Sequence, residues 1–303
     1  MAVYKQRTKP FELKMLESLH RRKALPEEEK RYYYNLAKGY EGEVTFDQLT
    51  EQLDCECLIL NDLLLNANNT SFQIDSVIVT LGKIYVYEVK NFDGDYYYEA
   101  DRLFKKPKYE VTNPLHQIVR SESLLRQLLL RNGFNFQIEA FIVFINQAFT
   151  LYQAPLNTPF IFPTQVNQHM KHLNSITTRL TAREKKVAEH LLSAHHPDSP
   201  YDRRPAYEYD QLEKGIICAN CYSNTSFIMG DKCCCRKCKC REPLTDAVLR
   251  SVQEFKRLFP SEKITTNGIH HWCRIVPSKR TIRRILKENF KSVGVRQWTY
   301  YEQ

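Results

Sequence analysis

Residues 72–92 read FQIDSVIVTLGKIYVYEVKNF, and this stretch decides the fold. Two runs rich in β-branched and aromatic residues flank Leu81-Gly82-Lys83, a pattern that predicts two antiparallel strands joined by a tight turn. Glu88 and Lys90 face the same side of the second strand, because side chains alternate along a strand. The turn brings Asp75 of the first strand level with Glu88. Two carboxylates and an ammonium group are therefore expected to meet.

Regular elements are also expected on both sides of this hairpin. The pattern over residues 27–54 predicts a helix, and strand-like runs follow at 57–65 and 96–100. Residues 93–95 are expected to close a second hairpin. Asn113-Pro114 predicts the start of a helix that ends near residue 131, and the apolar run 138–144 predicts a buried strand. This order predicts an α/β fold with a mixed sheet flanked by helices.

The predicted trio of Asp75, Glu88 and Lys90 suits phosphodiester hydrolysis. Carboxylate oxygens hold Mg²⁺ or Mn²⁺, the metal polarises the phosphate and acidifies a water, and a lysine orients that water. A Glu-x-Lys triplet alone is weak evidence, because such triplets are common on solvated strand faces. Charges at the end of an otherwise apolar strand are harder to explain in that way, since unpaired buried charges are costly.

Four motifs in order resemble the nuclease-related domain, a branch of the PD-(D/E)xK nuclease superfamily found mostly in bacterial proteins. They are residues 39–43 (GYEGE), 73–75 (QID), 88–91 (EVKN) and 113–117 (NPLHQ). The resemblance covers about residues 38–146. It implies a PD-(D/E)xK nuclease-like sheet in which Asp75 and Glu88 ligate the metal and Lys90 assists the attacking water.

The resemblance also implies roles for two helical residues. Glu43 would complete the acidic cluster, and Gln117 would contact substrate or water at the same site. Without the family, both would be read as exposed polar residues. Asn91 is left open, because a residue just past a strand can simply form the turn.

Ten cysteines are present, and eight of them lie between Cys218 and Cys273. No export signal is recognisable, so this cluster indicates metal ligation rather than disulfides. Two Cys-x-x-Cys pairs predict a four-cysteine zinc ribbon with structural zinc: Cys218, Cys221, Cys235 and Cys238. Whether Cys233, Cys234 or Cys240 also binds metal stays open: an alternative pairing through Cys240 is possible, and all three could be surplus thiols.

The C-terminal part of the chain is basic. The formal net charge is +9, and residues 274–303 hold eight Lys or Arg against two Glu. The run KRTIRRILKENF follows a shorter helical pattern, so a helix-turn-helix-like module is expected. Its second helix would present five cations to nucleic acid: Lys279, Arg280, Arg283, Arg284 and Lys287. A solvated basic helix is the alternative.

The divisions we expect are an N-terminal helical arm (1–26), the nuclease-related domain (27–150), a helical segment and linker (151–213), the zinc ribbon (214–243) and the basic helical domain (244–303). No apolar run is long enough for a membrane span, so we expect a cytoplasmic protein without a membrane partner. The predicted function is metal-dependent cleavage of DNA, with RNA as the less favoured substrate. The alternative is a nucleic-acid-binding protein whose nuclease fold is inactive or regulatory. The sequence does not indicate an oligomeric state.

Overall fold

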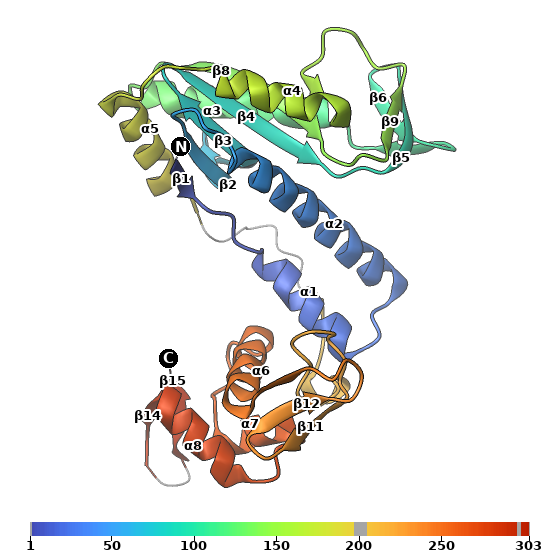
Figure 1. Ribbon diagram of the computed structural model, residues 1–303, viewed down its shortest axis with the longest axis vertical. Coiled ribbons are helices and arrows are strands. Elements are labelled where there is room, and N and C mark those ends of the chain that lie inside the picture. The colour runs from blue at the N-terminus through green and yellow to red at the C-terminus, as the bar shows by residue number, and fades with distance from the viewer. Residues whose placement is uncertain (1, 197–204, 296–297, 303) are drawn as a thin grey trace. The chain divides into compact units, whose positions relative to one another are not determined.

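The computed structural model describes residues 2–196, 205–295 and 298–302 (Figure 1). The chain forms two compact units. Unit 1 comprises residues 1–9 and 35–202, and unit 2 comprises residues 10–34 and 203–303. The boundary near residue 34 falls within helix α2 (Glu27–Thr50), which runs unbroken through Gly39 and Gly42.

Unit 1 is built on a six-stranded mixed sheet with the order β1-β2-β3-β4-β8-β10. The predicted hairpin is present as β3 (Thr70–Thr80) and β4 (Lys83–Lys90), which pair antiparallel around Gly82. β2 (Leu58–Ala67) pairs antiparallel with β3. β8 (Gln137–Phe144) runs parallel to β4, and the short β10 (Phe160–Ile161) runs parallel to β8.

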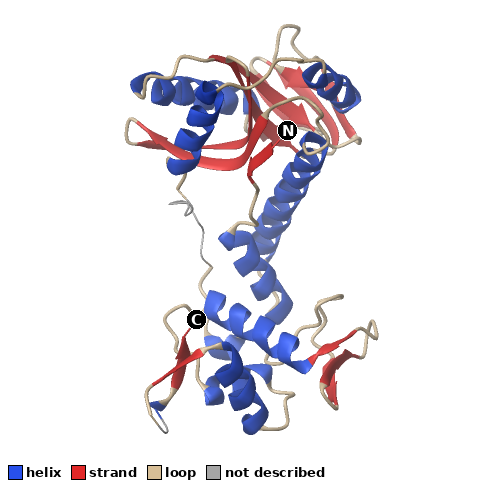
Figure 2. Ribbon diagram, turned by 60° about the vertical axis from the view of Figure 1, so that its left-hand side comes forward, coloured by secondary structure: helices blue, strands red, loops and turns tan. Residues whose placement is uncertain are grey.

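Helices cover both faces of this sheet (Figure 2). On one face, α3 (Pro114–Arg131) and α5 (Ala182–Ser193) bury Ile118, Leu125, Val187 and Leu191 against the strands. On the other, α2 and α4 (Pro163–Asn174) contribute Phe46, Val166, Met170 and Leu173 to a separate apolar cluster. The predicted fold class, a mixed sheet flanked by helices, is confirmed.

Two expectations about unit 1 were wrong. Residues 93–95 do not close a hairpin with β4, because β5 (Gly94–Glu99) belongs to a second sheet of order β7-β6-β5-β9. Its other strands are β6 (Arg102–Lys105), β7 (Tyr109–Val111) and β9 (Phe149–Tyr152). The chain also does not leave the domain at residue 150, because α5 buries an apolar face on the sheet. Part of the expected linker, residues 197–204, lies outside the described residues.

The expected N-terminal helical arm is also divided differently. β1 (Ala2–Lys5) is an edge strand that runs parallel to β2, whereas α1 (Phe11–Arg22) belongs to unit 2. The apolar residues of α1 explain this division, because Met15 and Leu19 are buried in the core of unit 2. The N-terminal residues therefore contribute to both units.

Unit 2 joins the cysteine module and the C-terminal helices around one core. A three-stranded sheet contains β11 (Ser226–Met229), β12 (Lys232–Cys235) and β13 (Arg241–Pro243). Helices α6 (Leu244–Leu258), α7 (Thr266–Cys273) and α8 (Lys279–Asn289) follow, then β14 (Lys291–Val293) and β15 (Tyr300–Glu302). Cys233 of β12 is buried with Trp272 and Ile285 of the helices. The two modules predicted on either side of residue 243 thus share a core.

A buried arginine fastens α1 to the rest of unit 2. Arg22 is fully buried, and its guanidinium donates to both carboxylate oxygens of Glu254 and to the backbone oxygen of Glu213. The same group lies 3.9 Å from the ring centre of Trp272. Its charge is therefore paired by a carboxylate and an aromatic face, as burial requires.

No helix in the described ranges has the length and apolar character needed to cross a membrane.

The two glycines of α2 should respond in opposite ways to substitution by alanine. A Cβ at Gly42 would lie 2.5 Å from the Cβ of Asn91, whereas a Cβ at Gly39 would meet nothing within 4 Å. We expect Gly42→Ala to destabilise the protein by about 1–3 kcal/mol through overpacking. Gly39→Ala should stabilise it by about 0.5–1 kcal/mol, because alanine is the better helix former. Urea unfolding followed by far-ultraviolet circular dichroism measures both free energies of unfolding. Equal changes in the two variants would contradict the close approach of Gly42 to Asn91.

Candidate functional site

The candidate catalytic site lies at the end of β4, where the hairpin partner and α3 converge. Ser76 pairs with Tyr87, so Asp75 stands one step further along the ladder, level with Glu88. The Oδ2 atom of Asp75 accepts a 2.7 Å hydrogen bond from the backbone nitrogen of Val89. Both Asp75 and Glu88 are buried. The hairpin therefore places the two carboxylates as the sequence pattern predicts.

A reversal of side-chain alternation accompanies this placement. In β3, Ile74 and Val77 lie in the same apolar cluster although they are three positions apart, and in β2 the same holds for Leu60 and Leu63. Two consecutive polar residues therefore interrupt the alternation at the same level of each strand. They are Asn61 and Asp62 in β2, and Asp75 and Ser76 in β3. Asp62 has a φ of 57°, which marks the local distortion.

Lys90 and Gln117 complete one side of the site. The Nζ atom of Lys90 lies 2.6 Å from Oε1 of Glu88 and donates to Oε1 of Gln117 at 3.2 Å. Gln117 lies in the first turn of α3, which Asn113 caps by accepting a hydrogen bond from the backbone nitrogen of Leu115. The capped helix therefore positions Gln117 against the strand that carries Glu88 and Lys90.

Glu43 approaches the site from α2 but is held by a residue that the sequence analysis did not single out. Arg7 forms a 2.6 Å ion pair with Glu43 and a second ion pair with Asp47 at 2.8 Å. Its Nη2 atom also donates to the backbone oxygen of Asp75 at 2.6 Å. The side chain of Arg7 is only 3% exposed. No local motif could have identified it, because its partners lie 36 to 68 residues further along the chain.

Asn91 has a structural role in the same region. Its Nδ2 atom donates to the backbone oxygen of Lys38 at 2.7 Å, and its Oδ1 atom accepts from Asn146 at 2.9 Å. Because its Cβ approaches Gly42 closely, Asn91 fixes α2 against the end of β4. This contact joins the segments of chain that carry the motifs GYEGE and EVKN.

The charges of this cluster do not balance. Lys90 and Arg7 supply two positive charges against the four carboxylates of Glu43, Asp47, Asp75 and Glu88. Burial, reinforced by the charge of Asp75, raises the pKa of both Glu43 and Glu88 to about 8. Burial also raises the pKa of Asp75. A cluster with two more carboxylates than cations, whose pKa values are raised, has the chemistry of a divalent-cation site with oxygen ligands.

Lys90 stays charged in this setting. Burial alone would lower its pKa, but the charges of Glu88 and Asp75 outweigh burial and raise it. The raised pKa of Glu88 favours a neutral carboxyl group, whereas the raised pKa of Lys90 favours a charged ammonium group, so the two values favour different states of this ion pair. The geometry favours a charged Lys90 facing a carboxylate set that shares protons, because one ammonium cannot neutralise Asp75 and Glu88 together.

Among the described residues, one group of three or more ligand side chains has all its ligand atoms within 4.8 Å of one another, and it consists of four cysteines. The carboxylates of the candidate site do not form such a group of three.

The second candidate metal centre lies in unit 2. The Sγ atoms of Cys218 and Cys238 are 3.6 Å apart, and those of Cys221 and Cys235 are 3.5 Å apart. Tetrahedral zinc with Zn–S bonds of about 2.3 Å places sulfurs about 3.8 Å from one another. The four predicted cysteines therefore form a set that could hold a metal ion of this size.

Local backbone geometry forms the two halves of this centre. Tyr222 and Lys239 each follow a Cys-x-x-Cys pair and adopt positive φ angles of 57° and 61°, which turn the chain sharply. Hydrogen bonds from the Ser223 hydroxyl and from backbone N–H groups lower the pKa of Cys235 to about 5, which favours a thiolate. Cys233, Cys234 and Cys240 are outside the set, so the alternative through Cys240 is not the arrangement found.

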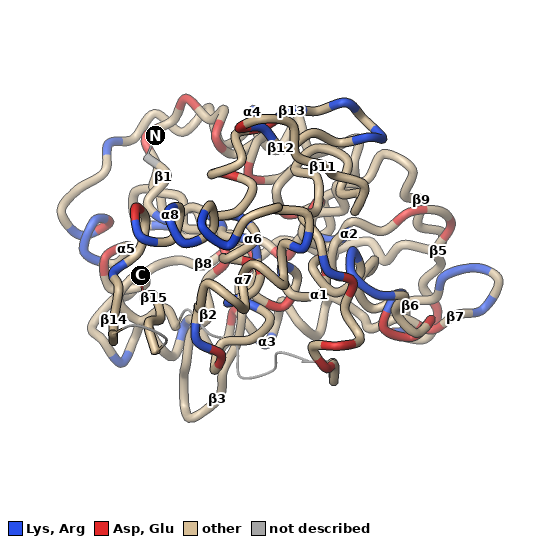
Figure 3. The backbone as a smooth tube through the Cα atoms, turned by 90° about the horizontal axis from the view of Figure 1, so that it is seen from below, with Lys and Arg blue, Asp and Glu red and all other residues tan. Residues whose placement is uncertain are grey.

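The five predicted nucleic-acid-binding residues lie on α8. Ser278 caps this helix, and Ile282, Ile285 and Leu286 bury its inner side. All five cations are exposed: Lys279, Arg280, Arg283, Arg284 and Lys287. Figure 3 shows Lys and Arg following one another along α8.

The comparisons with known proteins agree with the motifs of unit 1. Residues 38–145 match the family model of the nuclease-related domain, so the chain contains such a domain over about a third of its length. The predicted resemblance is confirmed. No curated protein matches the sequence. The crystal structure of protein VC1899 from Vibrio cholerae is similar over 56% of this chain and 37% of its own, with 13% identity and a TM-score of 0.23.

The buried carboxylates should give the metal-free protein a characteristic pH dependence. The folded pKa of Glu88, about 8, lies above its ordinary value of 4.5, so the folded state binds more protons than the unfolded chain between these limits. The free energy of unfolding therefore loses the contribution of Glu88 as pH rises from about 5 to about 8. We expect Glu88→Gln to gain stability relative to wild type across this range. Denaturation at pH 5, 6.5 and 8 measures this gain. The control is Glu139→Gln, which breaks the half-buried Lys83–Glu139 pair away from the site and should show a constant difference. A constant difference for Glu88→Gln as well would contradict the raised pKa.

Proposed function

We propose that this protein is a metal-dependent nuclease that hydrolyses phosphodiester bonds in DNA, with RNA as the less favoured substrate. The observation that carries the proposal is the convergence of Asp75, Glu88 and Lys90 at the end of β4, in a cluster with two more carboxylates than cations. The nuclease-related domain over residues 38–145 supports the same reading.

The residues of the site have distinct proposed roles. Asp75 and Glu88 would hold Mg²⁺ or Mn²⁺, which supplies Lewis-acid polarisation of the phosphate and a more acidic water. Lys90 would orient the attacking water and offset the charge that develops on the phosphate. Gln117, which accepts from Lys90 at 3.2 Å, would fix the direction of the ammonium group or contact the substrate. Glu43 would complete the acidic cluster, with Arg7 setting its position.

Unit 2 would supply structure and affinity. We propose that Cys218, Cys221, Cys235 and Cys238 bind one structural zinc ion. The exposed cations of α8 would contact nucleic acid phosphates, which bind by a salt-dependent, largely sequence-independent mechanism. The competing function is a nucleic-acid-binding protein with an inactive nuclease fold. The observation in its favour is that, among the described residues, no three carboxylates have their ligand atoms within 4.8 Å of one another.

Cleavage by matched variants tests the catalytic assignment. Single-stranded DNA, duplex DNA and RNA, each end-labelled, are incubated with wild type in Mg²⁺, Mn²⁺ or EDTA. We expect metal-dependent cutting that falls on the order of 100-fold or more in Glu88→Gln and in Lys90→Met, since each removes a charge at the reacting phosphate. Gln117→Ala should lose on the order of 10-fold.

The controls come from the same strands. Lys83 and Glu139 form a 2.7 Å ion pair at the other end of β4 and β8, so Lys83→Met and Glu139→Gln make the same chemical changes away from the site. Both should cut like wild type. If the folded, zinc-loaded protein cuts none of the substrates, the nucleic-acid-binding alternative replaces the nuclease. If all four variants cut equally, the assignment of Glu88 and Lys90 to catalysis fails.

Metal content tests the zinc assignment independently of cleavage. We expect one zinc ion per chain in wild type and in Cys240→Ser, because Cys240 lies outside the four-sulfur set. Cys235→Ser should lose the ion and lower the thermal unfolding temperature of unit 2, since a small module depends on its metal for stability. Inductively coupled plasma mass spectrometry measures the zinc. Retention of a full zinc equivalent by Cys235→Ser would show that other ligands hold it.

A further inference from the structure

The C-terminal hairpin packs beside α7 and α8 and completes a small surface. β14 and β15 pair antiparallel, and the backbone nitrogen of Tyr301 donates to the backbone oxygen of Ile264 at 2.9 Å. Ile264 lies just before α7, so the strand segment that precedes the helix pair is joined to the hairpin that follows it. The order is helix α6, strand segment, helices α7 and α8, then the hairpin. The hairpin is thereby fixed as a wing at one side of α8.

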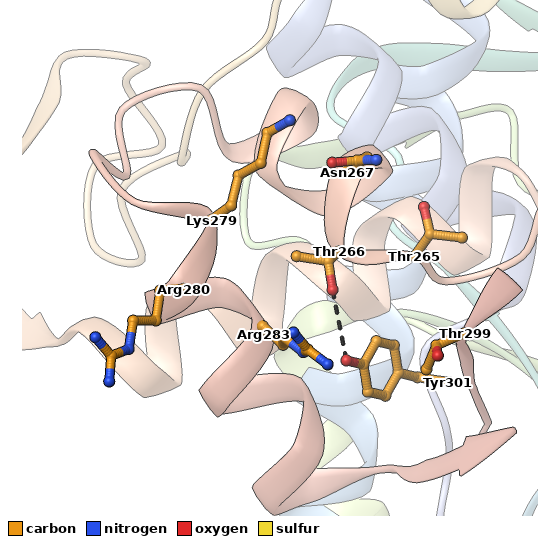
Figure 4. Close-up of a pocket in the computed structure, with 8 residues that line it drawn as sticks. All are labelled: Thr265, Thr266, Asn267, Lys279, Arg280, Arg283, Thr299 and Tyr301. Atoms are coloured by element: carbon orange, nitrogen blue, oxygen red, sulfur yellow. Dashed lines mark hydrogen bonds between the residues drawn. The ribbon is translucent and has the colours of Figure 1, made fainter. Parts of the chain in front are cut away.

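A pocket of about 480 Å³ opens between α7, α8 and this wing (Figure 4). Three cations line it, Lys279, Arg280 and Arg283, and its described lining contains no carboxylate. Arg283 extends toward the Thr266–Tyr301 pair, whose hydroxyl oxygens lie 3.4 Å apart. Cations and hydroxyl groups without a nearby carboxylate suit an anionic ligand with several oxygen acceptors.

The charges of α8 point to the same kind of ligand. The first turn of α8 carries no acidic residue, although the positive end of a helix favours acidic side chains there. Instead Lys279 and Arg280 occupy this turn. Within the part of the chain that the structure describes, no ion pair involves the five cations of α8. This arrangement is unfavourable in the isolated protein and becomes favourable when a polyanion binds.

The tip of the wing exposes apolar side chains. Val295 is 74% exposed and Trp298 is 76% exposed. Gly294 has a φ of 84°, and a Cβ there would lie 2.7 Å from the backbone oxygen of Trp298. The backbone at Gly294 therefore requires glycine, and the side chain of Trp298 is exposed. A large apolar side chain beside a basic helix is suited to contact sugars or base edges in a groove.

We propose that α8, the pocket and the wing together form a site for duplex DNA. This inference rests on the proposed contact of α8 with nucleic acid and names its substrate class. An α-helix of 11 residues with cations along its exposed side fits the major groove of B-form DNA, which is about 12 Å wide. The deep, narrow major groove of duplex RNA does not admit such a helix. The pocket receives a backbone phosphate, and Trp298 contacts the adjacent minor groove.

Binding of four polymers by the full-length, zinc-loaded protein without added divalent metal tests the duplex preference. Fluorescence anisotropy compares 20-mers of duplex DNA, single-stranded DNA, duplex RNA and single-stranded RNA at several salt concentrations. Duplex DNA should bind at least 10-fold more tightly than the other three. Arg283→Ala should weaken duplex binding on the order of 10-fold and reduce the salt slope by about one. Lys186→Ala, an exposed lysine on α5, is the matched control and should change neither.

The two tryptophans provide a probe of position. Trp272 is fully buried and Trp298 is exposed, so a change in tryptophan emission on adding duplex DNA reports the wing. We expect duplex DNA to quench the emission of wild type, with the quenching lost in Trp298→Phe.

Three results would overturn the proposal. They are equal or tighter binding of a single-stranded polymer or of duplex RNA, unchanged duplex binding by Arg283→Ala, or unchanged quenching in Trp298→Phe. None of them touches the nuclease assignment, which is judged by metal-dependent cleavage at Glu88 and Lys90.

Discussion

Unit 1 depends on a cluster of four carboxylates at the end of β4, of which Asp47, Asp75 and Glu88 are buried. Buried charge without a partner is costly, so the surrounding chain is committed to managing it. Arg7 crosses from the N-terminal strand to pair with Glu43 and Asp47, Lys90 pairs with Glu88, and the backbone nitrogen of Val89 donates to Asp75. The four carboxylates still outnumber these two paired cations by two, and the raised pKa values of Glu43 and Glu88 mean that the cluster tends to hold protons. A divalent cation bound to oxygen ligands is the simplest replacement for those protons.

The domain matched over residues 38–145 depends on segments of the chain that lie before and after it, both for pairing its carboxylates and for covering its sheet. Arg7 lies before that range, and α4 and α5 beyond it cover the two faces of the sheet. Removing residues 1–9 would expose the edge of β2 and leave Glu43 and Asp47 without their shared cation. The stability of the site and the integrity of the sheet are thus coupled through one short N-terminal segment.

The sequence predicted the parts of this arrangement that depend on local pattern. The hairpin around Gly82, the capped helix at Asn113 and the four-cysteine set were all recognisable, because turn chemistry, capping and ligand spacing are short-range signals. Three features could not be predicted from local sequence patterns, because they depend on contacts between residues distant in sequence. They are the pairing of Arg7 with Glu43, the joining of the cysteine module to the C-terminal helices through Cys233, and the departure of β5 into a second sheet. The reversal of alternation at Asp75 lies opposite the distortion at Asp62, where the register between β2 and β3 skips both residues.

The two units carry opposite excesses of charged groups. Unit 1 gathers more carboxylates than cations, which suits a bound metal but repels a phosphate that approaches without one. Unit 2 exposes cations on α8 that no carboxylate of the described chain pairs, and cations of this kind attract phosphate over a range set by salt. Under the proposed function, a polymer held by unit 2 would raise the local concentration of phosphodiesters for unit 1, so weak intrinsic affinity at the carboxylate cluster would be tolerable. Affinity and chemistry would then be separable by mutation, because the charges proposed to serve each belong to different parts of the chain.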